Sequence, residues 1–277
     1  MQREDIRDNF AVMGNAYTHF SFTAFLDSIC ALGLNKIDLW AGVPHLYAPD
    51  VDESELRRIR REIESRNITV VSYTPEMVPY PYDIAAEKGP LRTRTIEYLK
   101  RNMEIAASLE VPYMLLPAGR GLADLPREEN LKNMYENLET LTAYAEHLSL
   151  ELALEHLTVP SSPLINYAAD LKSALDATGS ARLHAVLDLG QMSVFSQTVD
   201  DYHALLGEEI RIVHIMDGDP NGHLAFGDGC LPLETYYKQV RNMGFKDPVV
   251  LEINDRRYFT DPHTAIKQCL EQIETWE

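Results

Sequence analysis

Four side chains of the types that bind metal ions each stand at the C-terminal end of a short hydrophobic run. They are Glu155 in LALEH, Asp188 in HAVLD, His214 in IRIVH and Glu252 in VVLE. Consecutive members lie roughly 30 residues apart, about the length of one strand-plus-helix unit. Three carboxylates and one imidazole suit a hard or borderline divalent cation such as Mn²⁺, Mg²⁺ or Co²⁺. We therefore predict one divalent metal site that contains all four residues.

The prediction requires a fold that brings four strand ends together. A lone acidic residue at a strand end often caps the next helix or pairs with a lysine, so no single member identifies the site. Several carboxylates buried near one another, however, are costly without a cation to offset their charge. In a parallel α/β barrel all strand C-termini lie on one face. A barrel would therefore place all four side chains at one opening.

Predicted strands and helices alternate along the chain. The strands, identified as short aliphatic runs, cover residues 10–14, 36–40, 68–73, 111–117, 150–157, 182–189, 210–217 and 247–254. The helices cover residues 22–33, 51–67, 90–109, 129–148, 166–178, 198–206, 231–244 and 262–276. Asn166 is expected to cap the helix that begins there, and Gly244 to end the helix before it.

These elements predict the fold class. The strands are continuous aliphatic runs, which favours a parallel sheet covered by helices. Eight units with functional residues at strand ends predict a single (β/α)8 TIM barrel over residues 1–277, with an open doubly wound sheet as the alternative. No G-x-G-x-x-G follows the first strand and no G-x-x-x-x-G-K-[ST] occurs. A nucleotide cofactor is therefore not expected.

The composition limits the partners of the protein. The chain has 277 residues, 45% of them hydrophobic, and a formal net charge of −18. Such an acidic surface repels nucleic acid and anionic membranes, and no apolar run approaches the roughly 20 residues that cross a bilayer. The three cysteines form no CxxC motif and the N-terminus lacks an apolar signal core. We expect a cytoplasmic protein without a disulfide framework.

Most of the chain resembles the xylose-isomerase-like superfamily of TIM barrels. The segments that carry the resemblance are NLETLTAYAEHLSLELALEHLT, HAVLDLGQM, VHIMDGDPNGHLAFGDG and VVLEI. Two further segments, IDLWAGVPHLYAPD (37–50) and SYTPEMVPYPYD (72–83), look like loops of fructoselysine 3-epimerases. The resemblance implies that Glu155, Asp188, His214 and Glu252 hold one divalent metal ion.

The same resemblance implies an activity. A metal ion chelated by a ketone oxygen and a neighbouring hydroxyl acidifies the carbon between them and stabilises an enediolate. Glu155 and Glu252 would then act as the acid/base pair on opposite faces of that carbon. The expected reaction is inversion at C3 of a 2-ketose or a ketose conjugate of the fructoselysine or psicoselysine type. No redox cofactor is needed.

Other residues after the strands are expected to bind the sugar, because loops on this face build the pocket in barrels. The predicted substrate-binding residues are Trp40, His45, Tyr73, Gln191 and His223. Trp40, Tyr80 and Tyr82 could form walls against sugar carbons, although a surface loop explains the two tyrosines equally well. His223 could equally be loop scaffolding. Gln191 stands where many ketose 3-epimerases have a histidine, which weakens a free-ketose assignment and is compatible with the fructoselysine subgroup.

Several alternatives remain open. Within the fold, the chain could be an aldose–ketose isomerase or a free-ketose (psicose or tagatose) 3-epimerase. An endonuclease IV-like DNA-repair enzyme is a remote alternative, because it would need more metal-binding histidines and a basic surface. A non-catalytic sugar-binding barrel would not need two glutamates on either side of a carbon. The resemblance also implies a possible homo-oligomer. Glu76 could favour the cationic end of a lysine conjugate.

Overall fold

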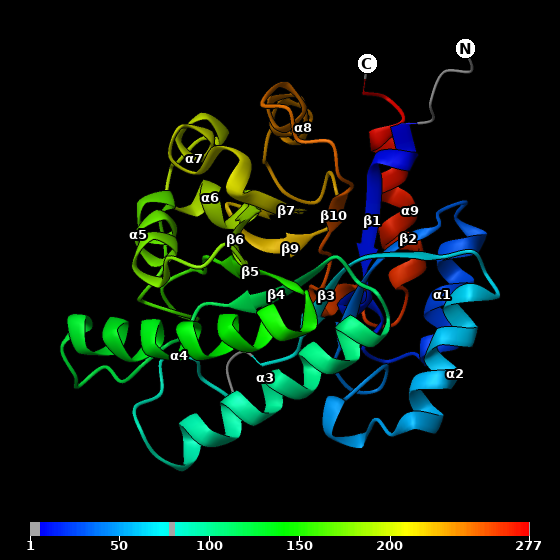
Figure 1. Ribbon diagram of the computed structural model, residues 1–277. Coiled ribbons are helices and arrows are strands. Elements are labelled where there is room, and N and C mark those ends of the chain that lie inside the picture. The colour runs from blue at the N-terminus through cyan, green and yellow to red at the C-terminus, as the bar shows by residue number, and fades with distance from the viewer. Residues whose placement is uncertain (1–5, 78–80, 277) are drawn as a thin grey trace.

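The computed structural model describes residues 6–77 and 81–276. Eight parallel strands form a closed barrel in the order β1-β10-β7-β6-β5-β4-β3-β2, which confirms the predicted fold (Figure 1). The strands of the barrel are β1 (Phe10–Met13), β2 (Lys36–Ala41), β3 (Thr69–Pro75), β4 (Tyr113–Pro117), β5 (Glu151–Glu155), β6 (Leu183–Asp188), β7 (Ile210–Ile215) and β10 (Val249–Leu251).

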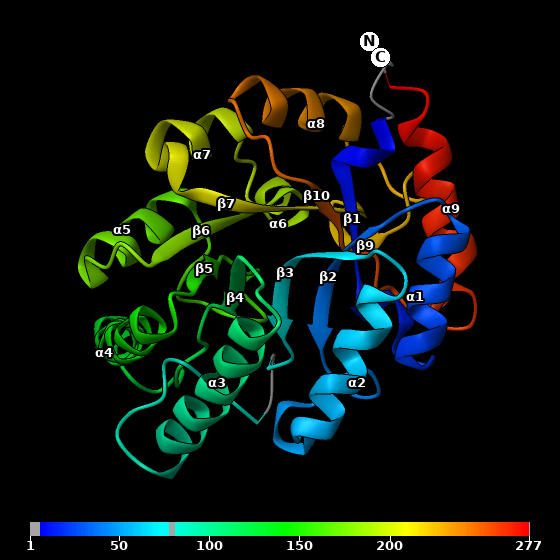
Figure 2. The same ribbon diagram turned by 45° about the vertical axis from the view of Figure 1, so that its right-hand side comes forward.

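Helices surround the strands on the outside of the barrel (Figure 2). They are α1 (Phe22–Ala31), α2 (Glu53–Glu64), α3 (Pro90–Ser108), α4 (Arg127–Leu148), α5 (Ala168–Thr178), α7 (Val199–Leu206), α8 (Leu233–Asn242) and α9 (Pro262–Ile273). The short helix α6 (Leu189–Val194) instead follows the end of β6 directly and carries Gln191. All eight predicted helices are present within a few residues of their expected ends. None of the helices in the described ranges is both long and apolar enough to cross a membrane.

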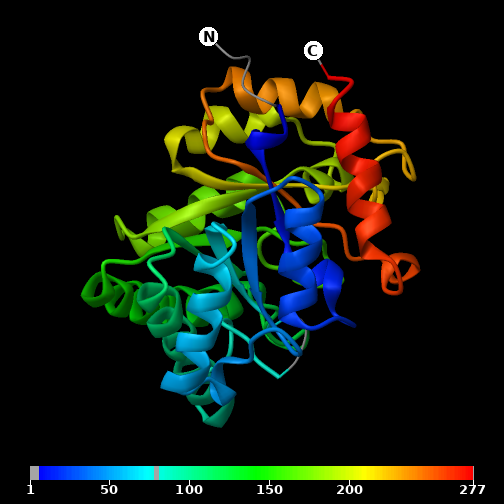
Figure 3. The same cartoon turned by 90° about the vertical axis from the view of Figure 1, so that its right-hand side faces the viewer.

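The two ends of the chain close the barrel. Strand β1 pairs with both β2 and β10, so the first strand bridges the second and the last. Helices α1 and α9 lie side by side (Figure 3). They are joined by a 2.7 Å hydrogen bond between Ser28 Oγ and His263 Nδ1. The barrel therefore depends on contacts between its first and last quarter.

Alternation of side chains along each strand separates two buried layers. A small cluster inside the barrel consists of Ala11, Met13, Trp40, Leu115, Ala153, Val186, Ile212 and Val250. A much larger cluster fills the space between the strands and the helices. Because neighbouring residues of a strand face opposite layers, Trp40 belongs to the inner cluster whereas Leu39 belongs to the outer one.

The sequence analysis did not predict several short elements, and it misplaced one helix cap. The short helix α6 and the hairpin of β8 (Asp217–Asp219) and β9 (Asn221–Leu224) have no periodicity that would reveal them. The prediction that Asn166 caps α5 is wrong. Its side chain donates instead to the carbonyls of Leu157 and Ser162, and the backbone N–H groups of Asn166 and Tyr167 donate to Asp170. Gly244 does follow α8, at a φ of +93°.

One buried carboxylate organises the loop between β7 and α8. Asp217 is 3% exposed. Its Oδ1 accepts hydrogen bonds from the N–H groups of Gly218 and Leu231, and its Oδ2 from those of Gly227 and Gly229. Four backbone donors, of which that of Gly218 is buried, are thus satisfied by one side chain. The loop that carries His223 is held in place by this residue.

We expect Asp217→Ala to lower the free energy of unfolding by about 2–4 kcal/mol, because it removes the acceptor of four backbone N–H groups, one of them buried. Urea denaturation of the two proteins measures the difference. The matched control is Asp219→Ala at the exposed end of β8, which should change the unfolding free energy by less than about 0.5 kcal/mol. Equal stability of Asp217→Ala and the unchanged protein would contradict this account of the loop.

Candidate active site

The four predicted metal ligands converge at one end of the barrel. Glu155 ends β5, Asp188 ends β6, His214 lies in β7, and Glu252 directly follows β10. Parallel pairing aligns Asp188 with His214, and Val250 with His214. One donor atom from each of the four residues lies within 4.8 Å of the others. The chain therefore assembles this group from four strands that are far apart in sequence.

The geometry of the group fits a cation better than a set of internal hydrogen bonds. His214 Nδ1 lies 3.0 Å from Glu155 Oε1 and 3.0 Å from Glu252 Oε2. Neither contact has hydrogen-bond geometry, and both His214 Nδ1 and Glu155 Oε1 are buried without a partner among the described residues. Buried polar atoms of this kind need a partner. Three oxygen donors and one nitrogen within 4.8 Å of one another are a suitable ligand set for a divalent ion.

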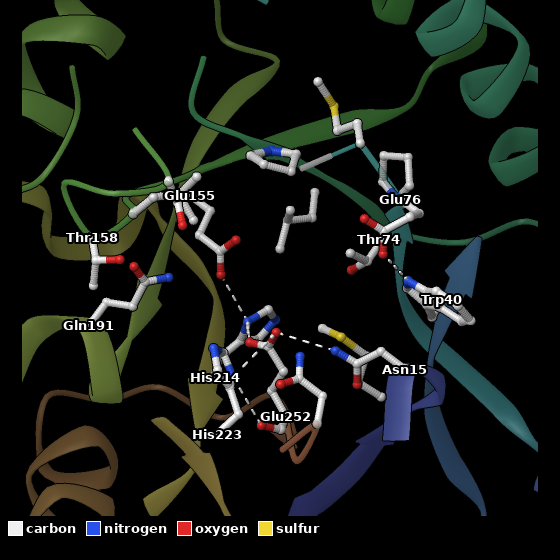
Figure 4. Close-up of a pocket in the computed structure, with 18 of the residues that line it drawn as sticks. Asn15, Trp40, Thr74, Glu76, Glu155, Thr158, Gln191, His214, His223 and Glu252 are labelled. Carbon is white, nitrogen blue, oxygen red and sulfur yellow. Dashed lines mark hydrogen bonds and ion pairs between the residues drawn. The ribbon is translucent and has the colours of Figure 1, made fainter. Parts of the chain in front are cut away.

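The two glutamates are held differently. Glu252 directs Oε2 toward His214, whereas its Oε1 accepts a hydrogen bond from Asn15 Nδ2 at 3.3 Å and lies 3.6 Å from His223 Nδ1 (Figure 4). No hydrogen bond to Glu155 Oε2 is found within the described parts of the chain. The second oxygen of Glu252 is thus fixed by the protein, and that of Glu155 is available to a bound molecule.

Burial and mutual repulsion perturb the ionisation of the group. Burial raises the pKa of Glu155 to about 7, and the charges of Glu252 and Asp188 act in the same direction. Burial also raises the pKa of Asp188, and Glu252 adds to this effect. Burial alone would raise the pKa of Glu252, but the charges of His223 and His214 hold it below its usual value. Burial would lower the pKa of His214, but Glu155 and Glu252 raise it well above 6.5.

A second layer of contacts orients Asp188. Its Oδ1 accepts from the Gln191 N–H at 2.8 Å, and its Oδ2 lies 3.3 Å from Gln191 Nε2. The Asp188 N–H donates to His156 Nε2 at 3.3 Å, and His156 Nδ1 lies 3.2 Å from the hydroxyl oxygen of Tyr202. Burial lowers the pKa of His156 to about 3, so this imidazole is neutral. Such contacts fix the direction of a ligand before an ion binds.

Three of the four ligand residues, all but Asp188, line a pocket of about 250 Å³. Of the predicted substrate-binding residues, Trp40, Gln191 and His223 also line this pocket. The sequence analysis missed Asn15, Thr74, Thr158 and Ser161, which line it as well. Asn15 could have been found, because it directly follows the strand predicted for residues 10–14. The hydroxyl residues are ordinary loop positions with no signal in their spacing.

Two predicted substrate-binding residues, His45 and Tyr73, are not among the residues that line the pocket. Tyr73 faces the helices, where its hydroxyl donates to Asn102 Oδ1 at 2.7 Å. A turn in which the His45 N–H donates to the Gly42 carbonyl buries the imidazole, which stacks on Phe25 with ring centroids 5.4 Å apart. Burial lowers the pKa of His45 to about 4, so the ring is neutral.

Tyr80 and Tyr82 were predicted as walls of the sugar pocket, and only Tyr82 lies within the described residues. Tyr82 stacks on Tyr98 with ring centroids 3.7 Å apart and is not among the residues that line the pocket. Its hydroxyl oxygen lies 2.8 Å from that of Tyr47. Tyr80 lies outside the described residues. Aromatic lining from the second strand therefore comes from Trp40.

Comparison with known proteins places these features in a family. The model of the xylose isomerase-like TIM barrel family matches residues 26–276. A fructoselysine 3-epimerase of Escherichia coli O157:H7 is 29% identical over 252 residues, which cover 90% of this chain and 91% of that protein. An inosose isomerase of Bacillus velezensis is 24% identical over 172 residues, or 59% of this chain and 61% of that protein.

Solved structures agree with the fold. A 3-keto-D-glucoside 4-epimerase from E. coli superposes with a TM-score of 0.80 at 16% identity, covering 96% of this chain and 99% of that chain. A D-psicose 3-epimerase from Clostridium cellulolyticum H10 superposes with a TM-score of 0.78 at 12% identity, covering 97% and 99%. These likenesses concern the fold. Because the family model spans residues 26–276 and the eight strands close as its description requires, this chain belongs to the xylose isomerase-like TIM barrel family.

Proposed function

We propose that the protein is a metal-dependent sugar epimerase that inverts C3 of a 2-ketose or a ketose conjugate. The observation that carries the proposal is the pair of glutamates. Glu155 and Glu252 both line the pocket, and a carboxylate oxygen of each lies 3.0 Å from the same nitrogen of His214. Two carboxylates on either side of one binding position can exchange protons with both faces of a carbon.

Glu155, Asp188, His214 and Glu252 would hold the ion, with Mn²⁺, Mg²⁺ and Co²⁺ as candidates. When bound, the ion would supply Lewis-acid stabilisation of negative charge on the ketose oxygens. The protein itself supplies the proton transfers. One glutamate removes the C3 proton, and the other returns a proton to the opposite face. Asn15 and His223 hold Glu252 Oε1, the oxygen that does not face His214.

The substrate we propose is of the fructoselysine or psicoselysine type. A relative that matches 90% of this chain is a fructoselysine 3-epimerase. Gln191, whose amide bonds Asp188, can donate to a sugar oxygen but cannot carry a proton. Proton transfer is thereby left to the two glutamates. The second candidate is an aldose–ketose isomerase, which would move a proton between C1 and C2 through the same type of enediolate. One relative, an inosose isomerase, is also an isomerase by name.

Replacement of either glutamate by glutamine should abolish most turnover. We expect Glu155→Gln and Glu252→Gln each to lower kcat by about a hundredfold to ten-thousandfold, because general acid–base catalysis contributes factors of that size. Metal-loaded protein is incubated with fructoselysine and with fructose, psicose and tagatose in D₂O, and NMR follows deuterium at C3. Any residual exchange in each variant should occur in only one of the two epimers, since the remaining glutamate faces one side of C3.

The matched control is Glu151→Gln at the opposite end of β5, which should keep near-normal activity. The metal content of every variant is measured, so that loss of the ion is separated from loss of a proton-transfer group. Full epimerisation by both glutamine variants would refute the proposal. Deuterium at C1, together with an aldose product, would favour the isomerase.

Metal affinity should rise with pH across neutrality. Without an ion, Glu155 with a pKa of about 7 and His214 with a raised pKa both retain protons near neutral pH. Binding needs the deprotonated ligands, so the ion must displace these protons. Isothermal titration calorimetry with Mn²⁺ between pH 6 and pH 8, in two buffers of different ionisation enthalpy, measures both affinity and proton release.

We expect tighter Mn²⁺ binding and less proton release at the higher pH, because fewer protons remain to be displaced. Asp188→Asn serves as the reference for a site that has lost a ligand, and it should weaken binding at every pH. An affinity independent of pH, with no proton release, would show that the four residues do not bind the ion as a group.

A further inference from the structure

The pocket has two walls of different chemistry (Figure 4). Thr158 and Gln191 form one side and present a hydroxyl and an amide. Trp40 and Glu76 form the facing side and present an indole and a carboxylate. Glu155, His214 and Glu252, three of the four predicted metal ligands, lie between these walls. A molecule held at the metal group would therefore meet neutral hydrogen-bonding groups at one end and a negative charge at the other.

Glu76 is held in place by its surroundings. It directly follows β3, and its N–H donates to the Ala41 carbonyl at 3.3 Å. Its carbonyl accepts from the Tyr98 hydroxyl at 2.8 Å. Its Oε2 accepts from Trp40 Nε1 at 2.9 Å, and Trp40 is only 5% exposed. A rigid indole thus sets the direction of the carboxylate, as a preorganised binding group requires.

The charge of the pocket favours a cationic ligand. Its described lining includes Glu76, Glu155 and Glu252 but neither Lys nor Arg. A divalent ion would offset two of the three negative charges of the ligand carboxylates. The carboxylate of Glu76 adds one more negative charge to the pocket. Phosphate or carboxylate groups on a sugar would be repelled from such a site, whereas an ammonium group would be attracted.

We propose that Glu76 is a specificity-determining residue that binds an ammonium group of the substrate, so that the preferred substrate is a ketose joined to an amine. The inference rests on the proposed function, because it assumes that a ketose binds at the metal group. The amine of such a conjugate is protonated at neutral pH. Its hydroxyl chain extends toward Thr158 and Gln191, and its ammonium pairs with Glu76 beside the face of Trp40.

The test compares two ligands that differ in one charge. Isothermal titration calorimetry measures the Kd of fructose and of 1-deoxy-1-propylamino-fructose for the metal-loaded protein and for Glu76→Gln. Glutamine has the shape of glutamate, and its amide oxygen can still accept from Trp40 Nε1. We expect the unchanged protein to prefer the amine by about tenfold or more, and the variant to lose most of that preference, because a hydrogen bond to a charged group is replaced by a neutral one.

Thr158→Val on the facing wall is the matched control. This variant should bind both ligands more weakly and leave the ratio of their Kd values unchanged. An unchanged ratio in Glu76→Gln, or no preference for the amine in the unchanged protein, would overturn the inference. Deuterium exchange at C3 is measured separately. A preference for the amine that depends on Glu76, without deuterium exchange at C3, would refute the epimerase and keep Glu76 as the ammonium site. Deuterium exchange at C3, with a ratio of Kd values that does not depend on Glu76, would refute this inference alone.

Discussion

The structure depends on holding three carboxylates and an imidazole together away from water. Burying such charges is costly unless a cation or hydrogen-bond donors compensate. The register of the barrel enforces their proximity, because Asp188 pairs with His214, and Val250, two residues before Glu252, pairs with His214 as well. A shift of one residue in any of these strands would turn its ligand toward the helices. The closed barrel thus makes the group rigid before any ion binds.

Loops then make the two glutamates unequal. The metal-facing oxygens of Glu155 and Glu252 lie at the same distance, 3.0 Å, from His214 Nδ1. Among the residues that the structure describes, only the other oxygen of Glu252 is held by side chains, from Asn15 after β1 and His223 in the β7–α8 loop. The β7–α8 loop depends in turn on Asp217, which accepts four backbone hydrogen bonds. The position of the Glu252 carboxylate is therefore linked to the packing of the β7–α8 loop, although none of the four predicted ligand residues lies on that loop.

The sequence predicted the parts of the molecule that periodicity and spacing determine. Eight strands, eight helices and the convergence of Glu155, Asp188, His214 and Glu252 all follow from aliphatic runs that end in ligand-type residues. The positions of His45 and Tyr73 do not follow from such patterns. Tyr73 is close to the right strand end, but alternation turns it toward Asn102 on α3. His45 is buried by a tight turn after β2, and a turn of this kind gives no periodic signal.

The polar groups around Asp188 limit how a proton can move in the site. Gln191 bonds Asp188 through its backbone and side-chain nitrogens, and an amide does not titrate in the physiological range. His156, which accepts from the Asp188 N–H, has a pKa of about 3 because it is buried, so it stays neutral. Neither neighbour can exchange a proton with a substrate at neutral pH. In the described lining of the pocket, the titratable side chains besides Glu76 are the two glutamates and the two histidines, His214 and His223. His214 faces the carboxylates of Glu155 and Glu252, and His223 lies beside Glu252. In the reaction we propose, the two glutamates would therefore be the groups best placed to transfer protons at a carbon held between them.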